Sequence, residues 1–371
     1  MEFENVEEIT TLAFDHKGNM DDRLIIEKTE DVVVGTSITY NYEKSKFGGR
    51  KQLIIRDFEP KHTEEAAEIA LGVYNYERAF TQELPEISDI PILKHLSGNG
   101  FGVAAFEGGK MVGFLCSVGP FENAFRSTDV KGVFSPMGAN GAVMENHDKI
   151  YAAMYQAAAK KWVKAGAVSH AICLYEHDEE AKKQLFRYGF GMRCADAIRP
   201  MKTMDCDSCS GYEFLELPKE EYAHIYPLHL ALNEHYCSSP FFVNRKPNTQ
   251  EEFLDFSERE KVRYFAAKKG GELCAYMEVS EEGETFAASG DLYRHITGAY
   301  CIPKHRGIGV YKNLLNYVIN TLKAEGYTRL GVDFESINPS GSRFWLKHFH
   351  AYTNSVVRRI DERIMQRASL I

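Results

Sequence analysis

The sequence has no long hydrophobic run. None of its apolar stretches approaches the roughly 20 residues that a membrane-spanning helix needs, although 44% of the 371 residues are hydrophobic. The first residues, MEFENVEEITTLAFD, lack the basic-then-apolar order of a secretory signal. We therefore expect a cytoplasmic protein with no membrane partner.

Metal-binding patterns and an excess of basic residues are also missing. The eight cysteines include one CxxC, formed by Cys206 and Cys209, and no second CxxC or HxxxH lies at zinc-site spacing. We interpret the pair as free thiols and expect no metal. The formal net charge of -9 disfavours nucleic acid as a partner, because phosphate binding relies on clusters of Lys and Arg. It favours a neutral or cationic substrate.

The chain does contain an internal repeat. Two helical segments end at Gly166 and Gly326, which lie 160 residues apart, and glycine is the usual stop for a helix. At the same offset, two apolar strands align, and so do two helices that begin at an Asx N-cap. The aligned pairs are 149–165 with 310–325, SHAICLY (169–175) with RLGVDFE (329–335), and 178–187 with 338–347.

The repeat predicts the fold class. Each half has the order β, α, α, β, β, β, α, β, α, β, which predicts an α+β fold whose mixed, mostly antiparallel sheets carry helices on both faces. The polar segment 203–211, TMDCDSCSG, marks the boundary. We expect domains at 51–205 and 206–371. The N-terminal extension, 1–50, matches neither half and contains one expected strand, 32–42.

The segment IPKHRGIGVYKNLL, 302–315, separates an expected strand from an expected helix. Gly307 and Gly309 let backbone N–H groups approach an anion closely. The helix that begins near Val310 adds unpaired N–H groups and the positive end of its dipole. Three basic residues precede the glycines, so the segment predicts a phosphate site. The alternative is a tight turn that needs glycine only for its shape, and this loop alone does not separate the two.

The order of these motifs resembles the GNAT family of acetyl-CoA-dependent N-acetyltransferases. A strand, R-G-x-G-[IV], a helix, a strand and N-x-x-(small)-x-x-F-[WY]-x-x-x-F follow one another within 211–371. Residues 50–205 resemble the family more loosely, through the repeat. The family's pyrophosphate loop reads [RQ]-x-x-G-x-[GA]. Here Arg306 and Gly309 fit that pattern, whereas Tyr311 stands where the family has Gly or Ala.

The resemblance implies acetyl-CoA as the co-substrate and two GNAT-like domains, the second better matched. It also implies which residues hold the co-substrate, in a gap where one strand splays from the next. Backbone groups of Tyr300, Cys301 and Ile302 would pair with pantetheine. The pyrophosphate would lie on Arg306, Gly307, Ile308, Gly309, Val310 and Tyr311. Asn338 would lie near the thioester end.

Acetyl transfer to an amine requires removal of a proton. Alternation along RLGVDFES places Asp333 and Glu335 on one face of the strand, about 7 Å apart. The resemblance implies a base at the position of Asp333. We predict that Asp333 or Glu335 relays the proton or binds the substrate ammonium. The alternative is that both carboxylates form ion pairs with Arg or Lys across the sheet, for example with Arg358 or Arg359 on the last strand. Glu278 is a third candidate.

The departing thiolate also needs a proton. The family's Tyr falls on Trp345, whose indole has no usable proton to release, and Phe344, Trp345 and Phe349 form an expected packing stripe. Either a different group, such as Tyr311, serves the thiolate, or the thiolate leaves without an acid. We expect His295 to be an exposed or hydrogen-bonded strand residue and not the base.

The first half lacks the phosphate loop. At the repeat offset the loop falls on 146–151, which has no glycine and includes Asp148, an acidic group that opposes a diphosphate. A glycine-rich run at 138–141 keeps cofactor binding there open. We predict an acetyltransferase that acts on a primary amine of a small molecule. The alternative is an acyl-CoA-binding pseudoenzyme or sensor. The acceptor stays unidentified, and a homodimer stays an open option.

Overall fold

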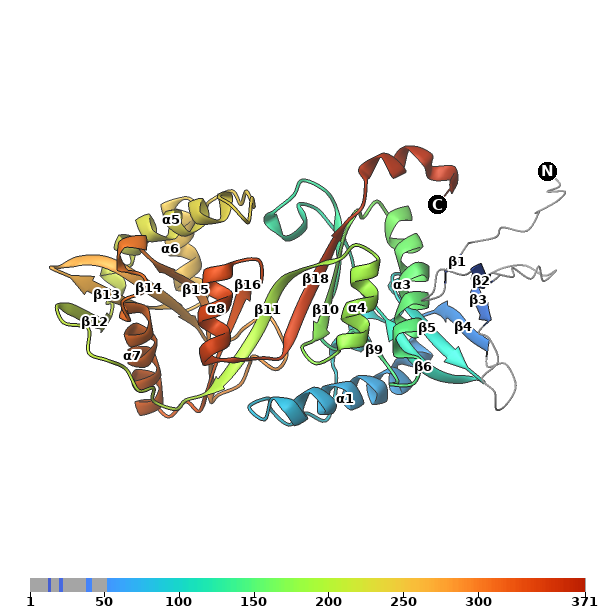
Figure 1. Cartoon of the computed structure of the whole chain (residues 1–371), viewed down its shortest axis with the longest axis horizontal. Helices are drawn as coiled ribbons and strands as arrows, with labels where there is room; N and C mark the ends of the chain where they lie inside the picture. Colours follow the sequence, from blue (N-terminus) through green and yellow to red (C-terminus); the bar gives the residue numbers. More distant parts are fainter. Residues whose placement is uncertain (1–12, 15–19, 23–37, 42–51, 371) are drawn as a thin grey trace.

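The computed structural model describes residues 13–14, 20–22, 38–41 and 52–370 of the chain. Two α+β halves lie one beside the other along the long axis of the molecule (Figure 1). Long strands cross the middle and connect the halves.

The first half runs from β4 to β11. Its strands are β4 (Gln52–Asp57), β5 (Val103–Glu107), β6 (Lys110–Leu115), β7 (Val118–Phe121), β8 (Gly132–Ser135), β9 (Asn140–Ala142), β10 (Ser169–Tyr175) and β11 (Gly191–Pro200). Its helices are η1 (Pro60–His62), α1 (Thr63–Phe80), α2 (Ile92–Leu96), η2 (Ala124–Arg126), α3 (His147–Lys164) and α4 (Glu179–Arg187).

The second half runs from β12 to the last helical turn. Its strands are β12 (Tyr212–Glu216), β13 (Arg263–Lys269), β14 (Glu272–Ser280), β15 (Tyr293–Cys301), β16 (Arg329–Glu335), β17 (His350–Ala351) and β18 (Thr353–Arg359). Its helices are η3 (Lys219–Ile225), α5 (Tyr226–Cys237), α6 (Gln250–Arg259), η4 (Pro303–His305), α7 (Val310–Ala324), α8 (Pro339–His348) and η5 (Glu362–Leu370).

Three short strands precede the first half. They are β1 (Ala13–Phe14), β2 (Met20–Asp22) and β3 (Ile38–Asn41). β3 pairs with β4 and falls inside the strand expected at 32–42, whose other residues lie outside the described part of the chain.

The repeat predicted from the sequence is present in the elements. β10 and β16 occupy the predicted residues, and α3 and α7 begin within two residues of the predicted starts. Both helices end next to a glycine with positive φ, Gly166 at 90° and Gly326 at 98°, a conformation that glycine adopts most easily. α4 and α8 begin at Asx caps: the side chain of Asp178 accepts from Ala181 N–H, and that of Asn338 from Gly341 N–H.

The strands form a mixed, mostly antiparallel arrangement, which confirms the predicted fold class. An 11-stranded sheet has the order β12-β13-β14-β15-β16-β11-β18-β10-β8-β7, with β17 paired to β11 beside this path. A 5-stranded sheet has the order β3-β4-β5-β6-β9. Among the pairs of described strands, β15 with β16 and β10 with β8 are parallel and the others are antiparallel.

The two halves exchange their last long strands. β11 of the first half pairs with β16 of the second, and β18 of the second pairs with β10 of the first. β11 and β18 also pair with each other in the middle of the molecule (Figure 1). Ala195 and Ala197 of β11 therefore belong to the core of the second half, and Val356 of β18 belongs to the core of the first.

Helices cover both faces of the sheet in the second half. Alternation along β13 directs Phe265 and Ala267 into the cluster that packs against α7. The intervening Tyr264 and Ala266 face the other way, toward a cluster that includes Phe253 of α6. This period of two is what a strand buried on both faces produces.

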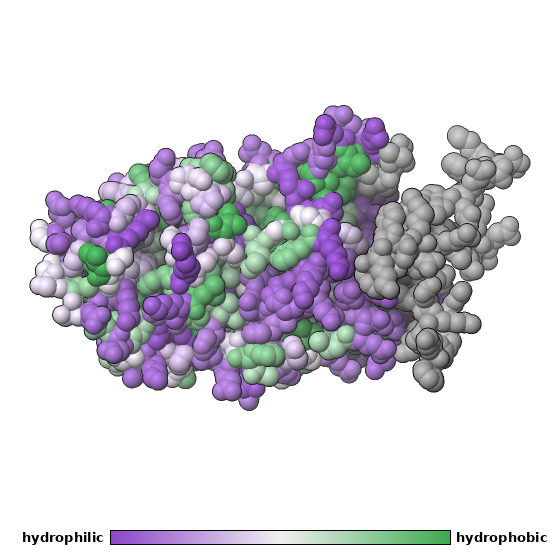
Figure 2. Space-filling view, in the orientation of Figure 1, coloured by the Kyte–Doolittle hydropathy of each residue, from purple (hydrophilic) through white to green (hydrophobic). Residues whose placement is uncertain are grey.

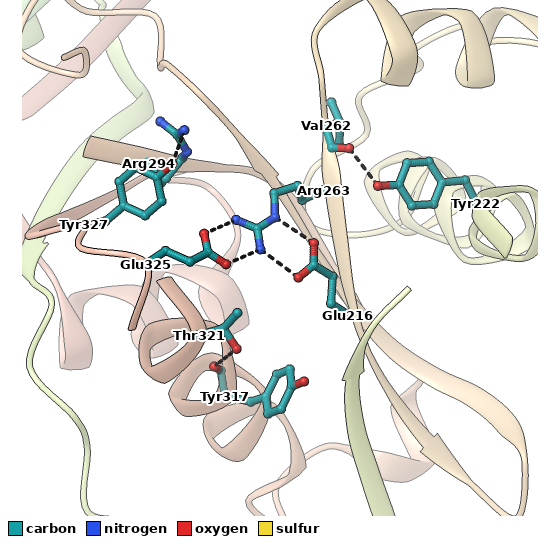
Figure 3. A network of polar contacts seen from close by, with 9 residues as sticks. All are labelled: Glu216, Tyr222, Val262, Arg263, Arg294, Tyr317, Thr321, Glu325 and Tyr327. Carbon is teal, nitrogen blue, oxygen red and sulfur yellow. Dashed lines mark hydrogen bonds and ion pairs between the residues drawn. The ribbon is translucent and has the colours of Figure 1, made fainter. Parts of the chain in front are cut away.

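A charged cluster ties one end of α7 to the sheet (Figure 3). Arg263 donates from Nε and Nη2 to Glu216 over 2.7 Å each, and from Nη1 to Glu325 over 2.6 Å. Glu216 ends β12, Arg263 begins β13, and Glu325 directly follows α7. Nearby, the Arg294 guanidinium stacks 4.0 Å from the centre of the Tyr327 ring.

One side of the surface is shown in Figure 2. The face in Figure 2 is mostly hydrophilic, with separate small apolar patches. Within the part of the chain that the structure describes, every helix is too short or too polar to cross a membrane.

Candidate active site

A split in the sheet opens beside β15. β15 pairs with β16 only as far as Ile296 and Val332. Beyond that point β15 stays with β14 up to Cys301, while β16 continues along β11 up to Glu335. The β14–β15 register shifts at the same place, so a bulge at Thr297 turns β15 away. From Thr297 to Cys301 one edge of β15 therefore has no strand partner among the described strands. We call this place the split.

The loop between β15 and α7 has the geometry of an anion site. Gly307 and Gly309 have φ of 77° and 87°, and a Cβ added at Gly307 would meet no atom within 4 Å. α7 begins at Val310, and its Gly309 N-cap supplies no side-chain hydrogen bond to the first turn. The first N–H groups of α7 are thus left for a ligand or water, and no acidic residue lies in that turn.

Arg306 is held beside this loop. Its Nε donates to the carbonyl of Cys301 over 2.7 Å, and its guanidinium lies 5.2 Å from the centre of the Tyr300 ring. The bond fixes the side chain along the end of β15, next to the open edge. Its remaining N–H groups keep their capacity to bind an anion.

Tyr311, where the sequence departs from the GNAT pattern, points inward. Its ring packs 5.1 Å from Phe344 and 6.1 Å from Trp345, and its hydroxyl donates to the carbonyl of Tyr276 over 3.3 Å. Burial raises the pKa of Tyr311 well above its usual range. The residue therefore stabilises the start of α7 from within and does not crowd the glycines.

A cleft of about 890 Å³ brings most of the predicted residues together. Its lining includes the predicted carboxylates Asp333 and Glu335, the third candidate Glu278, and six of the residues expected to hold acetyl-CoA: Tyr300, Cys301, Arg306, Gly307, Tyr311 and Asn338. Ile302, Ile308, Gly309 and Val310 are outside the lining. Residues of the first half, among them Phe134 and Ala171, complete the opposite end of the cleft.

Asp333 lies immediately after the split and is held by a buried histidine. His295 Nε2 lies 2.9 Å from Asp333 Oδ1, and His295 Nδ1 lies 2.5 Å from the hydroxyl of Tyr293. With Nε2–H donating to Asp333, Nδ1 accepts from Tyr293. His295 is fully buried, whereas 28% of the Asp333 side chain is exposed, so only the carboxylate is open to the cleft. His295 is hydrogen-bonded, as the sequence predicted.

Glycine makes room for this arrangement. A Cβ at Gly331, the register partner of His295, would lie 1.7 Å from the Tyr293 hydroxyl and 2.7 Å from His295 Nδ1. A Cβ at Gly283 would lie 2.5 Å from the same nitrogen. The glycine in the middle of RLGVDFE was the signal in the sequence for such a close approach.

Glu335 is bound by two arginines. Arg193 Nε lies 3.0 Å from Glu335 Oε2, and Arg245 donates to Glu335 Oε1. Burial raises the pKa of Glu335, and the two guanidinium groups oppose that rise. The alternative of an ion pair with an Arg or Lys across the sheet holds for Glu335, through Arg193 of β11, whereas Arg358 and Arg359 as the partners are wrong. The guanidinium of Arg358 donates to the Tyr155 hydroxyl, and that of Arg359 pairs with Glu362, because β18 lies beside β10 and not beside β16.

Two further carboxylates line the cleft near the split. Glu278 accepts from Thr297 Oγ1 over 3.0 Å and from the Tyr264 hydroxyl over 3.4 Å, and burial raises its pKa to about 7. Asp196 of β11 lies opposite Asp333 in register, and burial raises its pKa to about 7 as well. Sequence reasoning missed Asp196, because β11 belongs to the first half.

Trp345 and Asn338 have structural roles in this fold. Trp345 is buried and packs 4.9 Å from Phe344 and 5.5 Å from Phe349, as expected for a core aromatic residue. Asn338 caps α8 and also lines the cleft.

The sequence was compared with known families, and the fold with solved structures. Residues 229–350 match the profile of the Acetyltransferase (GNAT) family. This part of the chain is a GNAT acetyltransferase domain. Among curated proteins, none matches the chain.

One solved structure supports the same fold, and a second match is weaker. The GCN5-related N-acetyltransferase from Sphaerobacter thermophilus has a TM-score of 0.54 at 12% identity, over 83% of this chain and 95% of that one. A tandem GNAT protein from the clavulanic acid biosynthesis pathway has a TM-score of 0.42 at 13% identity, over 83% of this chain and 98% of that one. At these identities the first similarity shows the fold alone.

In the first half, the region equivalent to the GNAT split is filled. Asn140 Nδ2 donates to Ser135 Oγ and to the carbonyl of Cys173, each over 3.0 Å, and Tyr151 donates to Asn140 Oδ1 over 2.8 Å. These side chains are buried and connect β8, β9, β10 and α3. These hydrogen bonds join β8, β9 and β10 at the place where the second half has its split.

The first half also lacks an open anion loop. Asp148 lies in the first turn of α3, where a negative charge disfavours a diphosphate. In the glycine-rich run, a Cβ at Gly138 would lie 2.9 Å from Ile90 and 3.0 Å from Phe286. This glycine serves close packing, in contrast to the open surroundings of Gly307.

Proposed function

We propose that the chain transfers an acetyl group from acetyl-CoA to a primary amine of a small molecule. The observation that carries the proposal is that the split, the glycine loop and five carboxyl groups border one cleft. The match of residues 229–350 to a GNAT acetyltransferase domain supports the same reaction class.

The residues present fit acetyl-CoA. Backbone N–H groups at Gly307 to Tyr311 and the start of α7 would hold the pyrophosphate, with Arg306 beside them. The free edge of β15 at Tyr300, Cys301 and Ile302 would pair with the pantetheine amides. Asn338, at the start of α8, would lie at the thioester end. Acetyl-CoA supplies an activated acyl group as a thioester.

Deprotonation of the acceptor falls to the carboxylates at the split. The acceptor arrives as an ammonium ion and must lose a proton before its nitrogen attacks the thioester carbon. Asp333, held by His295 and partly open to the cleft, is assigned this role, with Glu278 next to the same opening. Glu335 is not assigned the proton transfer, because it already pairs with two arginines. Its proposed role is to hold their guanidinium groups in place at the cleft. The C–N bond then forms, the C–S bond breaks, and the CoA thiolate takes a proton.

An acyl-CoA sensor without transfer activity is the second candidate. The observation that favours it is the absence of a free acid at the expected place. Trp345 is a core residue, and the hydroxyl of Tyr311 is engaged with a backbone carbonyl. Protonation of the thiolate by water would let transfer proceed without such an acid.

Thiol release in the presence of amines separates the two candidates. The full chain is mixed with acetyl-CoA and a panel of amines, and free thiol is detected. Transfer predicts thiol release that one or more amines stimulate and that Asp333→Asn combined with Glu335→Gln abolishes. Asp361→Asn, at an exposed carboxylate outside the cleft, is the control and should keep the rate. CoA binding without amine-stimulated release would establish the sensor.

A further inference from the structure

Glu335 has an excess of positive charge around it. It is a single carboxylate, yet Arg193 from β11 and Arg245 from the segment between α5 and α6 both pair with it. Two guanidinium groups therefore share one carboxylate, and these ion pairs leave one positive charge unbalanced. Arg245 is further fixed by its position 5.4 Å from the centre of the Tyr236 ring.

Both arginines also have buried donors without a partner. Arg193 Nη2 and Arg245 Nε are buried and make no hydrogen bond within the described part of the chain. An unsatisfied buried donor is destabilising. A guanidinium presents its N–H groups in a planar fork that matches a carboxylate. An anionic group from a ligand would satisfy these donors and balance the excess charge.

The neighbouring part of the cleft is lined by acidic side chains instead of arginines. Asp333, Glu278 and Glu284 all line it, and no described residue forms an ion pair with Glu278 or Glu284. Asp333 and Glu335 are two residues apart on one strand face, so roughly 7 Å separates the two regions. The cleft is therefore bipolar, with carboxylates at the split and guanidinium groups one short step further along β16.

We propose that the acceptor is an amine that also carries a carboxylate, in the class of amino acids. Its amino group faces Asp333 at the split, and its carboxylate lies on Arg193 and Arg245. This inference rests on the proposed transfer function, because that function makes the cleft an acceptor site. A polyamine would bring a second cation against the guanidinium groups, and a simple alkylamine would leave their donors unpaired.

Matched pairs of compounds test the inference. Each pair differs only in the carboxylate: lysine and cadaverine, ornithine and putrescine, phenylalanine and phenethylamine, histidine and histamine. Calorimetry measures the binding of each compound to the full chain saturated with CoA, and thiol release from acetyl-CoA measures turnover. In at least one pair, the member with the carboxylate should bind at least about tenfold more tightly, in keeping with a charge-assisted bidentate contact.

Variants of Arg245 locate the source of that preference. Arg245→Met should reduce the preference to about twofold or less, mainly through KM, while the compounds without a carboxylate bind as before. Arg245→Lys should keep part of the preference, because it retains the charge but not the fork. Arg259→Met, at an exposed arginine paired with Glu260 outside the cleft, is the matched control and should change nothing.

Several outcomes would overturn the inference. They are equal or tighter binding of the amine without the carboxylate in every pair, binding of neither member in every pair, and an unchanged preference in Arg245→Met. CoA itself offers phosphates as an alternative anion. If Arg245→Met weakens CoA binding as much as Arg306→Ala does, the guanidinium groups serve the nucleotide. Selective binding of amino acids without thiol release would reject the transfer function and with it the word acceptor, and it would leave standing only the assignment of Arg193 and Arg245 to a ligand carboxylate.

Discussion

At the scale of single residues, burial keeps protons on carboxylates near the split. Glu278 and Asp196 are almost inaccessible to solvent, and burial raises the pKa of each to about 7. Asp196 also lies opposite Asp333 in the register of β11 and β16, and like charges that face each other across strands are unfavourable. Near neutral pH these groups exchange protons readily, which suits a proton relay.

Asp196 should make stability depend on pH. Its carboxyl keeps a proton in the folded state up to about pH 7, whereas an unfolded chain loses that proton near pH 4. Between these values the unfolded state binds fewer protons, so the free energy of unfolding falls as pH rises, and it levels off above pH 7. Asp196→Asn should remove this fall, so that the variant gains about 2 kcal/mol relative to the wild type between pH 5 and pH 8.

Chemical denaturation at the two pH values measures the gain. Thr353 donates to Asp196 in the wild type, and an asparagine keeps an acceptor for that bond. A difference between variant and wild type that is the same at pH 5 and pH 8 would contradict the burial of an ionisable Asp196.

The residues of the site were partly predictable from the sequence. Strand alternation placed Asp333 and Glu335 on one face, and both line the cleft. Their partners could not be predicted, because those partners come from distant parts of the chain. Arg193 is supplied by β11 of the other half, and Arg245 by an irregular segment with no periodic signal. The roles proposed for Asp333 and Glu335 stay predictions.

At the scale of elements, local signals located most boundaries. α7 exposes one face and buries Val310, Leu314, Val318 and Leu322 on the other, which is the helical spacing visible in the sequence. Glycine stops and Asx caps are properties of a few adjacent residues, so the ends of α3, α7, α4 and α8 followed from sequence alone. The division of residues 118–142 into β7, β8 and β9 was not predicted from the sequence.

The charged cluster at the far end of α7 should contribute to the free energy of unfolding and should not influence the affinity for CoA. Arg263 joins β12, β13 and α7 through Glu216 and Glu325 (Figure 3). Arg263→Met removes several charge-assisted hydrogen bonds that are only partly exposed, so the free energy of unfolding should fall by about 1–3 kcal/mol. The glycine loop lies at the other end of the helix, roughly 22 Å away at 1.5 Å per residue, so affinity for CoA should be unchanged.

Chemical denaturation and calorimetry with CoA check both parts of this prediction. Lys261→Met is the control, because its ion pair with Glu281 is long, at 3.6 Å, and exposed and should contribute less than 1 kcal/mol. A loss of CoA affinity in Arg263→Met would show that the cluster also shapes the loop.

At the scale of the whole molecule, the exchanged strands make the two halves one structure. β11 completes the sheet and core of the second half, and β18 does the same for the first. The repeat predicted the order of elements, but two similar halves offer equivalent edges, so the sequence pattern does not say which half a final strand joins. The boundary expected at 206 therefore marks a change in composition, and we propose that it does not separate independently folding units.

Shared strands should produce a single unfolding transition. The full chain should give one calorimetric peak, because the loss of either half removes a central strand from the other. Residues 206–371 expressed alone lack β11, so they should not form a soluble protein that binds CoA, and co-expression with residues 1–205 should restore it. Two separated peaks, or a soluble and binding-competent fragment 206–371, would contradict this view.

Calorimetric titration of the full chain with CoA tests whether the glycine loop is the CoA site. We predict one site per chain, at the N-terminus of α7, and a loss of affinity of at least about tenfold when Arg306→Ala is combined with Gly309→Glu, which places a negative charge against the diphosphate. Lys149→Glu introduces a glutamate at the equivalent position of the first half and should leave binding unchanged. Two sites per chain, or undiminished affinity in the double variant with its fold intact, would contradict the account.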